Sequence, residues 1–125
     1  MMDADTASAA LGIELMDLGE GRAVCRMAVT AQMINGHDLC HGGYVFLLAD
    51  TAFACACNTH GPVTVAAGAE ITFVSPAHAG DVLVAEAAER TRYGRSGVYD
   101  ITVRKPGGQV VAEFRGRSRE LRRER

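Results

Sequence analysis

The sequence has few aromatic residues, no tryptophan and no long apolar run. Only 6% of its 125 residues are aromatic and its net charge at pH 7 is −2, whereas domains that bind nucleic acid are usually basic. No stretch reaches the roughly 18 uncharged apolar residues of a membrane span. The acidic start from Met1 to Asp5 is unlike a secretory signal. We therefore predict a cytoplasmic protein that binds neither nucleic acid nor a membrane.

Cysteine patterns typical of metal sites or redox motifs are also missing. None of the four cysteines forms a Cys-x-x-Cys pair. Cys40, His41 and Asp38 are too crowded along the chain for known metal-ligand spacing. We expect reduced, buried thiols and no metal site.

Repeats, linkers and low-complexity segments are absent, and the length suits one domain spanning residues 1–125. Charge is nevertheless unevenly distributed. Residues 1–89 hold 11 acidic and 2 basic side chains, whereas residues 90–125 hold 4 acidic and 11 basic ones. The basic part is either a set of solvated strand edges and a tail, or a positive rim for a ligand that carries phosphate.

Apolar periodicity and turn residues predict one long helix between two groups of strands. We expect a short Ala-rich helix over 3–11, a strand region over 13–16 and 22–29, and a helix that opens at Gly42 and ends before Gly61. Later strands are expected at 63–74, 82–92, 98–104 and 109–118, with a charged, frayed tail at 119–125. At about 1.5 Å per residue, a helix of roughly 17 residues crosses five strands about 4.8 Å apart. The predicted class is α+β, a hotdog fold in which an antiparallel sheet of five to six strands wraps around a central helix.

Asp50 is the one charged residue between His41 and His60, in the longest apolar run of the chain. A helix that is apolar all round is normally buried. Burying a carboxylate without partners costs several kcal/mol, by order of magnitude. Asp50 is therefore either paired with structure, for example with a backbone amide, or is present for catalysis.

A series of short motifs, in order along the chain, resembles a known family. The motifs are Asn35-Gly-His-Asp38, His41-Gly-Gly43, Leu48-Ala-Asp50, Ser75-Pro-Ala77, Gly80-Asp81, Gly94-Arg-Ser-Gly-Val-Tyr-Asp100 and Glu113-Phe-Arg-Gly-Arg117. Over nearly its whole length the chain is similar to the hotdog-fold acyl-CoA thioesterases of the phenylacetate-degradation (PaaI-type) subfamily. The resemblance implies hydrolysis of phenylacetyl-CoA and its ring-hydroxylated derivatives by a homotetramer built from two dimers. Coenzyme A would be part of the substrate, and no separate cofactor is expected.

Thioester hydrolysis needs a polarised carbonyl and a base or nucleophile. The amides of Gly42 and Gly43 lie at the predicted helix start, where N–H groups lack partners within the helix and carry partial positive charge. We expect Gly42 to donate to the thioester oxygen and Gly43 to contact substrate, unless both glycines serve only the turn. Asp50 would be the base or the nucleophile, with a pKa raised by its apolar surroundings.

The remaining candidate residues follow mainly from the resemblance. Asn35 matches a position that orients water or the thioester, although beside Gly36 it is also a turn former. His41 either donates to the carbonyl or caps the helix. His37 and His60 are interpreted as surface or turn residues.

Two groups of candidates concern the substrate's ends. Tyr44 and Phe46 are expected to line the acyl pocket. The turn Gly94, Arg95, Ser96 and Gly97 would lie near the pantetheine and phosphates of CoA, or is simply a hairpin turn. Arg115 and Arg117 would add phosphate contacts or form ion pairs. Some related enzymes carry a hydroxyl that binds water where this chain has 65–68, and here it is absent unless Thr64 substitutes for it.

Helix geometry adds an expectation of its own. Gly42 and Asp50 are eight residues apart, which places them about 12 Å apart along one helix. One thioester carbon cannot contact both, so they must come from different subunits with antiparallel helices, which gives two sites per dimer. The shared sites of the family agree with this. The alternatives are a non-catalytic hotdog domain that binds acyl-CoA and a hotdog dehydratase.

Overall fold

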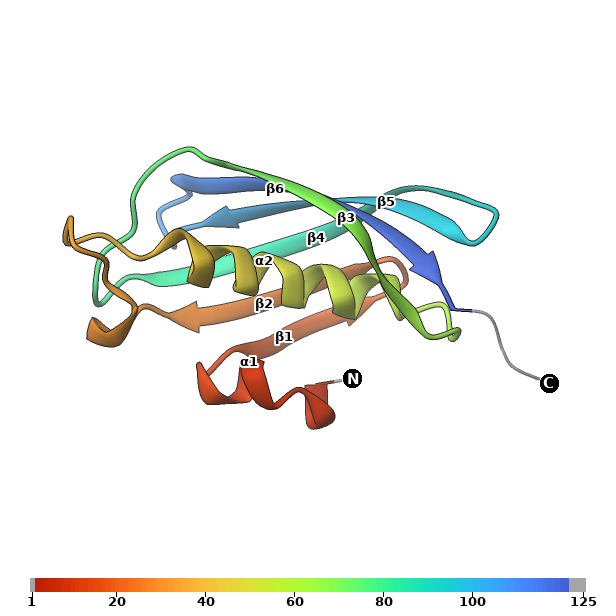
Figure 1. The fold of residues 1–125 in the computed structure, drawn as a ribbon, viewed down its shortest axis with the longest axis horizontal. Helices are drawn as coiled ribbons and strands as arrows, with labels where there is room; N and C mark the ends of the chain where they lie inside the picture. The colour runs from red at the N-terminus through yellow and green to blue at the C-terminus, as the bar shows by residue number, and fades with distance from the viewer. Residues whose placement is uncertain (1, 122–125) are drawn as a thin grey trace.

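A computed structural model describes residues 2–121 and shows one long helix held against a single sheet (Figure 1). The helices are η1 (Met2–Ala4), α1 (Thr6–Ala10), η2 (Ala31–Met33) and α2 (Gly42–Cys57), where η marks a 3-10 helix. The strands are β1 (Glu14–Gly19), β2 (Arg22–Ala28), β3 (Thr64–Phe73), β4 (Val82–Tyr93), β5 (Ser96–Arg104) and β6 (Val110–Glu120).

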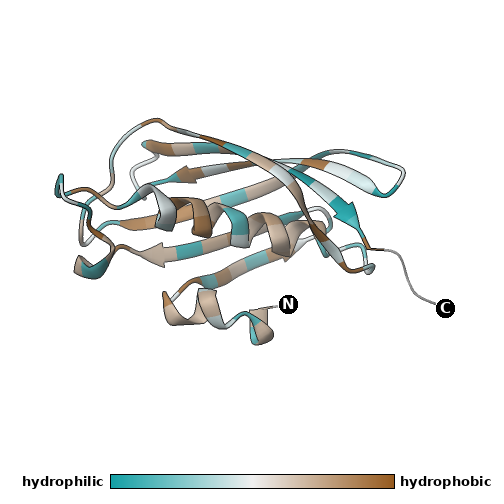
Figure 2. Cartoon of the chain, viewed as in Figure 1, coloured by the Kyte–Doolittle hydropathy of each residue, from teal (hydrophilic) through white to brown (hydrophobic). Residues whose placement is uncertain are grey.

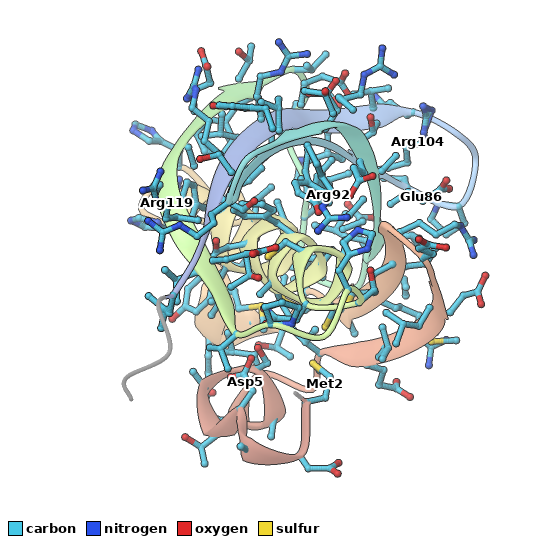
Figure 3. All side chains as sticks on the ribbon, turned by 90° about the vertical axis from the view of Figure 1, so that its right-hand side faces the viewer. Met2, Asp5, Glu86, Arg92, Arg104 and Arg119 are labelled. Atoms are coloured by element: carbon cyan, nitrogen blue, oxygen red, sulfur yellow. The ribbon has the colours of Figure 1, made fainter. Side chains whose placement is uncertain are left out.

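All six strands belong to one antiparallel sheet, in the order β1-β2-β4-β5-β6-β3. Seen along the helix, the sheet curves around α2 (Figure 3). The predicted arrangement of a sheet around a central helix is therefore confirmed. The sequence did not predict the position of β3, which precedes β4 in the chain but lies beside β6 at the edge of the sheet.

The core lies between α2 and the concave face of the sheet. Along β4 and β5 buried and less buried residues alternate, and the buried ones include Leu83, Ala85, Tyr99 and Ile101. α2 is drawn mostly in apolar colours (Figure 2), and its buried residues include Leu48, Ala49, Ala52, Phe53 and Ala56. An apolar helix of this kind is stable only when it is enclosed.

Phe53 is the central side chain of this core, at 1% exposure. Its ring centroid lies 5.5 Å from that of Tyr99 and 6.0 Å from that of Phe114. Gly116 of β6 lets the ring approach, because a Cβ on Gly116 would lie 2.6 Å from the ring of Phe53.

The two ends of the chain differ from the sequence-based expectation. The first helix is shorter than predicted and is divided into η1 and α1 by Asp5, which is the N-cap of α1. Residues 119 and 120 are not frayed, because β6 continues to Glu120, whose amide donates to the Arg95 carbonyl at 2.7 Å. The rest of the predicted tail, 122–125, lies outside the described residues. Between residues 2 and 121, no helix has both the length and the apolar character needed to cross a bilayer.

We predict that Gly116→Ala destabilises the protein by about 1–3 kcal/mol, the usual cost of overpacking a core. The new methyl group would meet the ring of Phe53, which is enclosed on all sides. The control is Gly107→Ala, where a Cβ meets nothing within 4 Å. Urea unfolding at one fixed protein concentration measures both variants. Equal stability of the two variants would contradict the packing role of Gly116.

Candidate active site

The N-terminus of α2 presents two glycine amides, and within residues 2–121 only one of them donates a hydrogen bond. His41 is its N-cap, and the His41 Nδ1 accepts a hydrogen bond from the Gly43 amide at 3.0 Å. The Gly43 amide is therefore already used, and the cap interpretation of His41 is the one observed. Within residues 2–121 the Gly42 amide donates no hydrogen bond. Gly42 thus presents a free N–H at the positive end of the helix dipole.

The turn before the helix is built around Asn35. The Asn35 Oδ1 accepts hydrogen bonds from the amides of His37 and Leu39, at 2.9 and 3.2 Å. Asp38 takes the left-handed conformation, with φ at 65°. Asn35 therefore does form the turn. Its amino group has no acceptor in the described part of the chain, so it can still donate to a ligand.

A cavity of about 450 Å³ opens beside these two donors. It is lined by Asn35, Leu39, Cys40, Gly42, Val45, Phe73, Ser75, Pro76, Ala77 and Val111. Phe73 lies so close to Gly42 that a Cβ on that glycine would be 2.8 Å from the ring. Sequence reasoning missed Phe73 and Val111, because they come from β3 and β6 and no local motif links them to the helix start.

Asp50 lies two turns further along α2 and does not line this cavity. It is half-buried, and among residues 2–121 its carboxylate takes part in no hydrogen bond or ion pair. Burial, and secondarily the negative charge of Asp5, raise the pKa of Asp50 above its ordinary value. A hydrogen bond or ion pair to an ionised carboxylate would lower its pKa. The alternative in which Asp50 is paired with structure is therefore not observed among residues 2–121.

Two other candidate residues, Tyr44 and Phe46, lie in the first turns of α2. Phe46 packs edge-on against Phe114, with ring centroids 5.1 Å apart, and the ring centroid of Tyr44 lies 6.4 Å from that of His41. Neither residue lines the cavity beside Gly42.

The turn 94–97 joins β4 to β5 at the far end of the molecule, beyond the C-terminus of α2 (Figure 1). Gly94 has a positive φ of 59°, which favours glycine. Gly97 is buried, and a Cβ there would lie 2.8 Å from the Ser118 hydroxyl, so this glycine has a packing role. Arg115 forms a bidentate ion pair with Asp100, and Arg117 forms an ion pair with Glu70 at 2.6 Å. Of the two roles considered for these arginines, ion pairing is the one observed.

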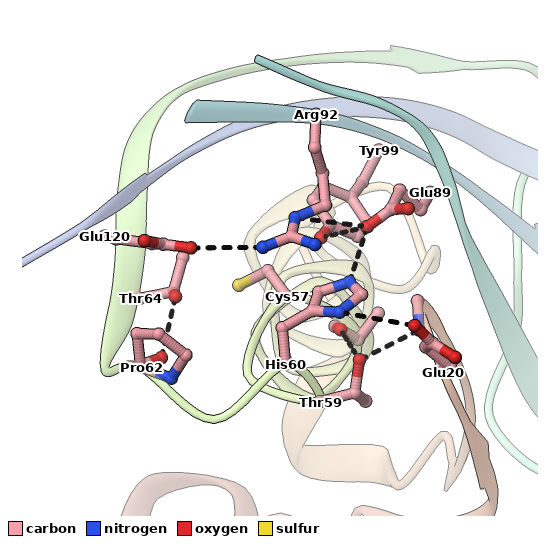
Figure 4. A network of polar contacts seen from close by, with 12 residues as sticks. Glu20, Cys57, Thr59, His60, Pro62, Thr64, Glu89, Arg92, Tyr99 and Glu120 are labelled. Carbon is pink, nitrogen blue, oxygen red and sulfur yellow. Dashed lines mark hydrogen bonds and ion pairs between the residues drawn. The ribbon is translucent and has the colours of Figure 1, made fainter. Parts of the chain in front are cut away.

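The C-terminal end of α2 is closed by a polar network (Figure 4). The Glu89 Oε1 accepts from the Tyr99 hydroxyl at 2.9 Å and lies 2.7 Å from the His60 Nε2. His60 lies in the turn that follows α2, which agrees with its interpretation as a surface or turn residue, but its side chain is only 11% exposed. The Thr64 hydroxyl donates to the Pro62 carbonyl at 2.9 Å within the same closing turn.

Comparison with known proteins identifies the family. Residues 37–112 match the family model of the thioesterase superfamily. Acyl-coenzyme A thioesterase PaaI of Escherichia coli is 48% identical over 121 residues, which cover 97% of this chain and 86% of that protein. This chain belongs to the thioesterase superfamily. Within it, the chain is an acyl-CoA thioesterase of the PaaI type.

Solved structures of this superfamily share the fold closely. The Escherichia coli PaaI protein from the phenylacetic acid degradation operon has a TM-score of 0.95, with 98% of this chain and 88% of that chain covered at 48% identity. A mutant of phenylacetic acid degradation protein PaaI from Thermus thermophilus has a TM-score of 0.90 at 36% identity, with 94% and 100% covered. The hotdog fold predicted from the element order is therefore confirmed.

We predict that Asp50→Asn raises the melting temperature at pH 7. An aspartate in an unfolded chain titrates near pH 4 (about 3.9), whereas the folded-state pKa of Asp50 is higher. As pH rises through this window the unfolded state loses its proton first, so the wild type loses stability and does not regain it at higher pH. The variant avoids this loss, and its advantage should vanish below about pH 4. Calorimetry across pH measures the difference. A variant less stable than wild type at pH 7 would show that the ionised carboxylate is held by a favourable contact.

Proposed function

We propose that this thioesterase hydrolyses aryl-type acyl-CoA thioesters, such as phenylacetyl-CoA and its ring-hydroxylated derivatives, to free acid and CoA. The relative named acyl-coenzyme A thioesterase PaaI supports the acyl-CoA part of the proposal. The structure from the phenylacetic acid degradation operon supports the aryl part. The mostly apolar cavity beside Gly42 offers a surface suited to an arene or another apolar group.

In the proposed mechanism, the Gly42 amide donates to the thioester oxygen while Asp50 acts on the carbonyl carbon. As a base, Asp50 takes a proton from water, whose oxygen forms the new bond to carbon. The C–S bond then breaks, and the departing CoA thiolate recovers a proton. As a nucleophile, the Asp50 carboxylate attacks the carbonyl carbon and expels the CoA thiolate, which takes up a proton. Water then cleaves the mixed anhydride to the free acid and the Asp50 carboxylate. Asn35, through its free amino group, would orient the water or the thioester, and His41 would hold the Gly43 amide in place.

One observation carries the proposed site: Gly42 and Asn35 share a cavity from which Asp50 is absent, although Asp50 is half-buried and lacks a partner among residues 2–121. About 12 Å of rigid helix separates Gly42 from Asp50. A second copy of the chain, with its α2 antiparallel to the first, would bring its Asp50 to the cavity. The active sites would then lie at a two-fold dimer interface, two per dimer.

The edge strand β3 supports such an interface. It lies at the border of the sheet, and the apolar side chains of Val63, Val65, Phe73 and Val74 on and beside it are 41–64% exposed. Unpaired edges with apolar side chains favour pairing with another chain. Phe73 also lies over Gly42, so a partner seated along β3 would reach the mouth of the cavity.

The same antiparallel arrangement would extend to the rest of the site. The turn 94–97 lies at the end of α2 remote from Gly42, so the partner's copy of this turn would approach the cavity from the other subunit. Arg95 would then contact CoA, with Gly43, Tyr44 and Phe46 on the near side. The tetramer and the cytoplasmic location stay predictions; light scattering of the purified protein tests the first.

We predict that Asp50→Ala lowers kcat by about 100- to 10,000-fold, the usual contribution of a positioned base. Free CoA released from a panel of aryl and alkyl acyl-CoA substrates is followed with a thiol dye. The control is Glu86→Gln, which removes an exposed carboxylate on β4 (labelled in Figure 3). Turnover that survives Asp50→Ala would reject the mechanism, and binding of acyl-CoA without turnover in the wild type would favour a non-catalytic domain.

We predict that two inactive variants restore activity when mixed. One carries Asp50→Ala and the other Asn35→Asp, which keeps the acceptor oxygen of the turn but loses the free amino group. In a mixed dimer one of the two sites has both intact halves, so random exchange restores up to about a quarter of the wild-type activity. Differently tagged subunits report the extent of exchange. If exchange is complete and no activity returns, the shared site is wrong.

A further inference from the structure

The N-terminal segment, residues 2–11, is docked onto α2 beside Asp50. Its contact is a buried chain of hydroxyl groups, in which the Ser8 Oγ lies 2.9 Å from the Thr51 Oγ1. Ser8 is 0% exposed and Thr51 is 4% exposed. Thr51 is the residue after Asp50 in α2, so the segment contacts the helix next to the residue that carries the half-buried carboxylate.

Asp5 holds Ser8 in this position. The Asp5 Oδ1 accepts from the Ser8 amide at 2.9 Å, and the Asp5 Oδ2 accepts from the Ser8 hydroxyl at 2.6 Å. The short distance to Oδ2 indicates a hydrogen bond to an ionised carboxylate. The same two bonds hold the pKa of Asp5 below its ordinary value. Asp5 therefore stays negatively charged over the pH range in which an aspartate with a raised pKa titrates.

The hydroxyl groups of Ser8 and Thr51 have two hydrogen atoms for three contacts, and this fixes the direction of each hydrogen bond. The Ser8 hydroxyl donates to Asp5, so its oxygen can only accept from Thr51. The Thr51 proton is then shared between the Ser8 oxygen and the Leu47 carbonyl, which is 2.8 Å away. Thr51 is thus the donor that ties the segment to α2.

We propose that Asp5 is a positioning residue that acts through Asp50: clamped by Ser8 and Thr51, it sets a fixed negative charge near the reactive carboxylate. In this way the N-terminal segment, and not α2 alone, would decide how strongly Asp50 holds a proton. A base that holds its proton more strongly is a better proton acceptor near neutral pH. The proposal rests on the proposed role of Asp50 in catalysis.

Within residues 2–121, two ionisable groups interact with Asp50. They are Asp5, from the docked segment, and the Cys57 thiol, from α2 itself. Burial raises the pKa of Cys57 to about 12, so this thiol is neutral near pH 7. Asp3, in the same segment, is exposed and makes no hydrogen bond or ion pair within residues 2–121. Asp5 is therefore the charge to test, and Asp3 is the matched control.

The experiment compares the pH dependence of kcat/KM for wild type, Asp5→Asn and Asp3→Asn. Asparagine is an equally good N-cap, so α1 should persist. Loss of the Asp5 charge should make Asp50 easier to ionise, which moves the acid limb of the profile to lower pH. Asp3→Asn should leave the limb in place. A limb that does not move in Asp5→Asn, even if kcat/KM falls at every pH, would show a merely structural role and overturn the proposal.

Two further variants test the clamp. Thr51→Val removes the hydroxyl at nearly constant volume and should move the acid limb in the same direction as Asp5→Asn. Thr51→Ser retains the hydroxyl and should return the limb towards its wild-type position. A limb that moves equally in both Thr51 variants, or in neither, would show that the hydroxyl contact does not transmit the effect.

Direct titration separates this proposal from the proposed function. The ¹³C signal of the Asp50 carboxyl, assigned by its loss in Asp50→Asn, is followed with pH in wild type and Asp5→Asn. A lower midpoint in Asp5→Asn supports the proposal, and an unchanged midpoint overturns it, whatever the activity. If Asp50→Ala is fully active while the midpoint still moves, the catalytic role of Asp50 fails and the electrostatic coupling stands.

Discussion

The structure depends on enclosing α2, a helix that is apolar on nearly all sides, with a single curved sheet. A helix of this kind is not stable in water, and one sheet can cover only part of its circumference. The sheet covers the side on which Phe53 packs against Phe114 and Gly116. The docked N-terminal segment covers another part, at Thr51. The positions of α1 and of the proposed partner subunit follow from the part of the helix that the sheet leaves uncovered.

The two ends of α2 differ in how their polar groups are hydrogen-bonded, and this difference marks the candidate site. At the C-terminal end the exchange between Asn58 and Thr64, with bonds of 3.0 Å in both directions, ties the helix to the start of β3. The nearby carboxylate of Glu89 is bound through its Oε1 by His60 and Tyr99. At the N-terminal end the cavity is lined by Gly42 and Asn35, whose backbone N–H and side-chain amino group, respectively, have no acceptor among residues 2–121. A rigid rod anchored at one end can hold donors at the other end in fixed positions.

Asp50 shows what the enclosure of α2 means for chemistry. The burial that stabilises the helix disfavours the charged form of this carboxylate, so the ionised Asp50 lowers stability while the proposed base gains affinity for a proton. The negative charge of Asp5 acts in the same direction. Because Gly42 and Asp50 belong to one rigid helix, their separation cannot change within the chain. The proposed assembly of two chains would bring both to one carbonyl group.

The sequence by itself determined the local features. Apolar periodicity predicted α2 and the strands, and glycines predicted the turns. The one charge in an apolar run indicated Asp50 as a candidate, and the glycine at the predicted helix start indicated Gly42. The sequence could not give the place of β3 beside β6, because strand order depends on contacts between distant segments. For the same reason it could not show Phe73 over Gly42, His60 paired with Glu89, or the link from Ser8 to Thr51. Hydrogen bonds between side chains 29 or 43 residues apart leave no periodic trace in a sequence, so only the tertiary structure decided which residues surround the helix and its one carboxylate.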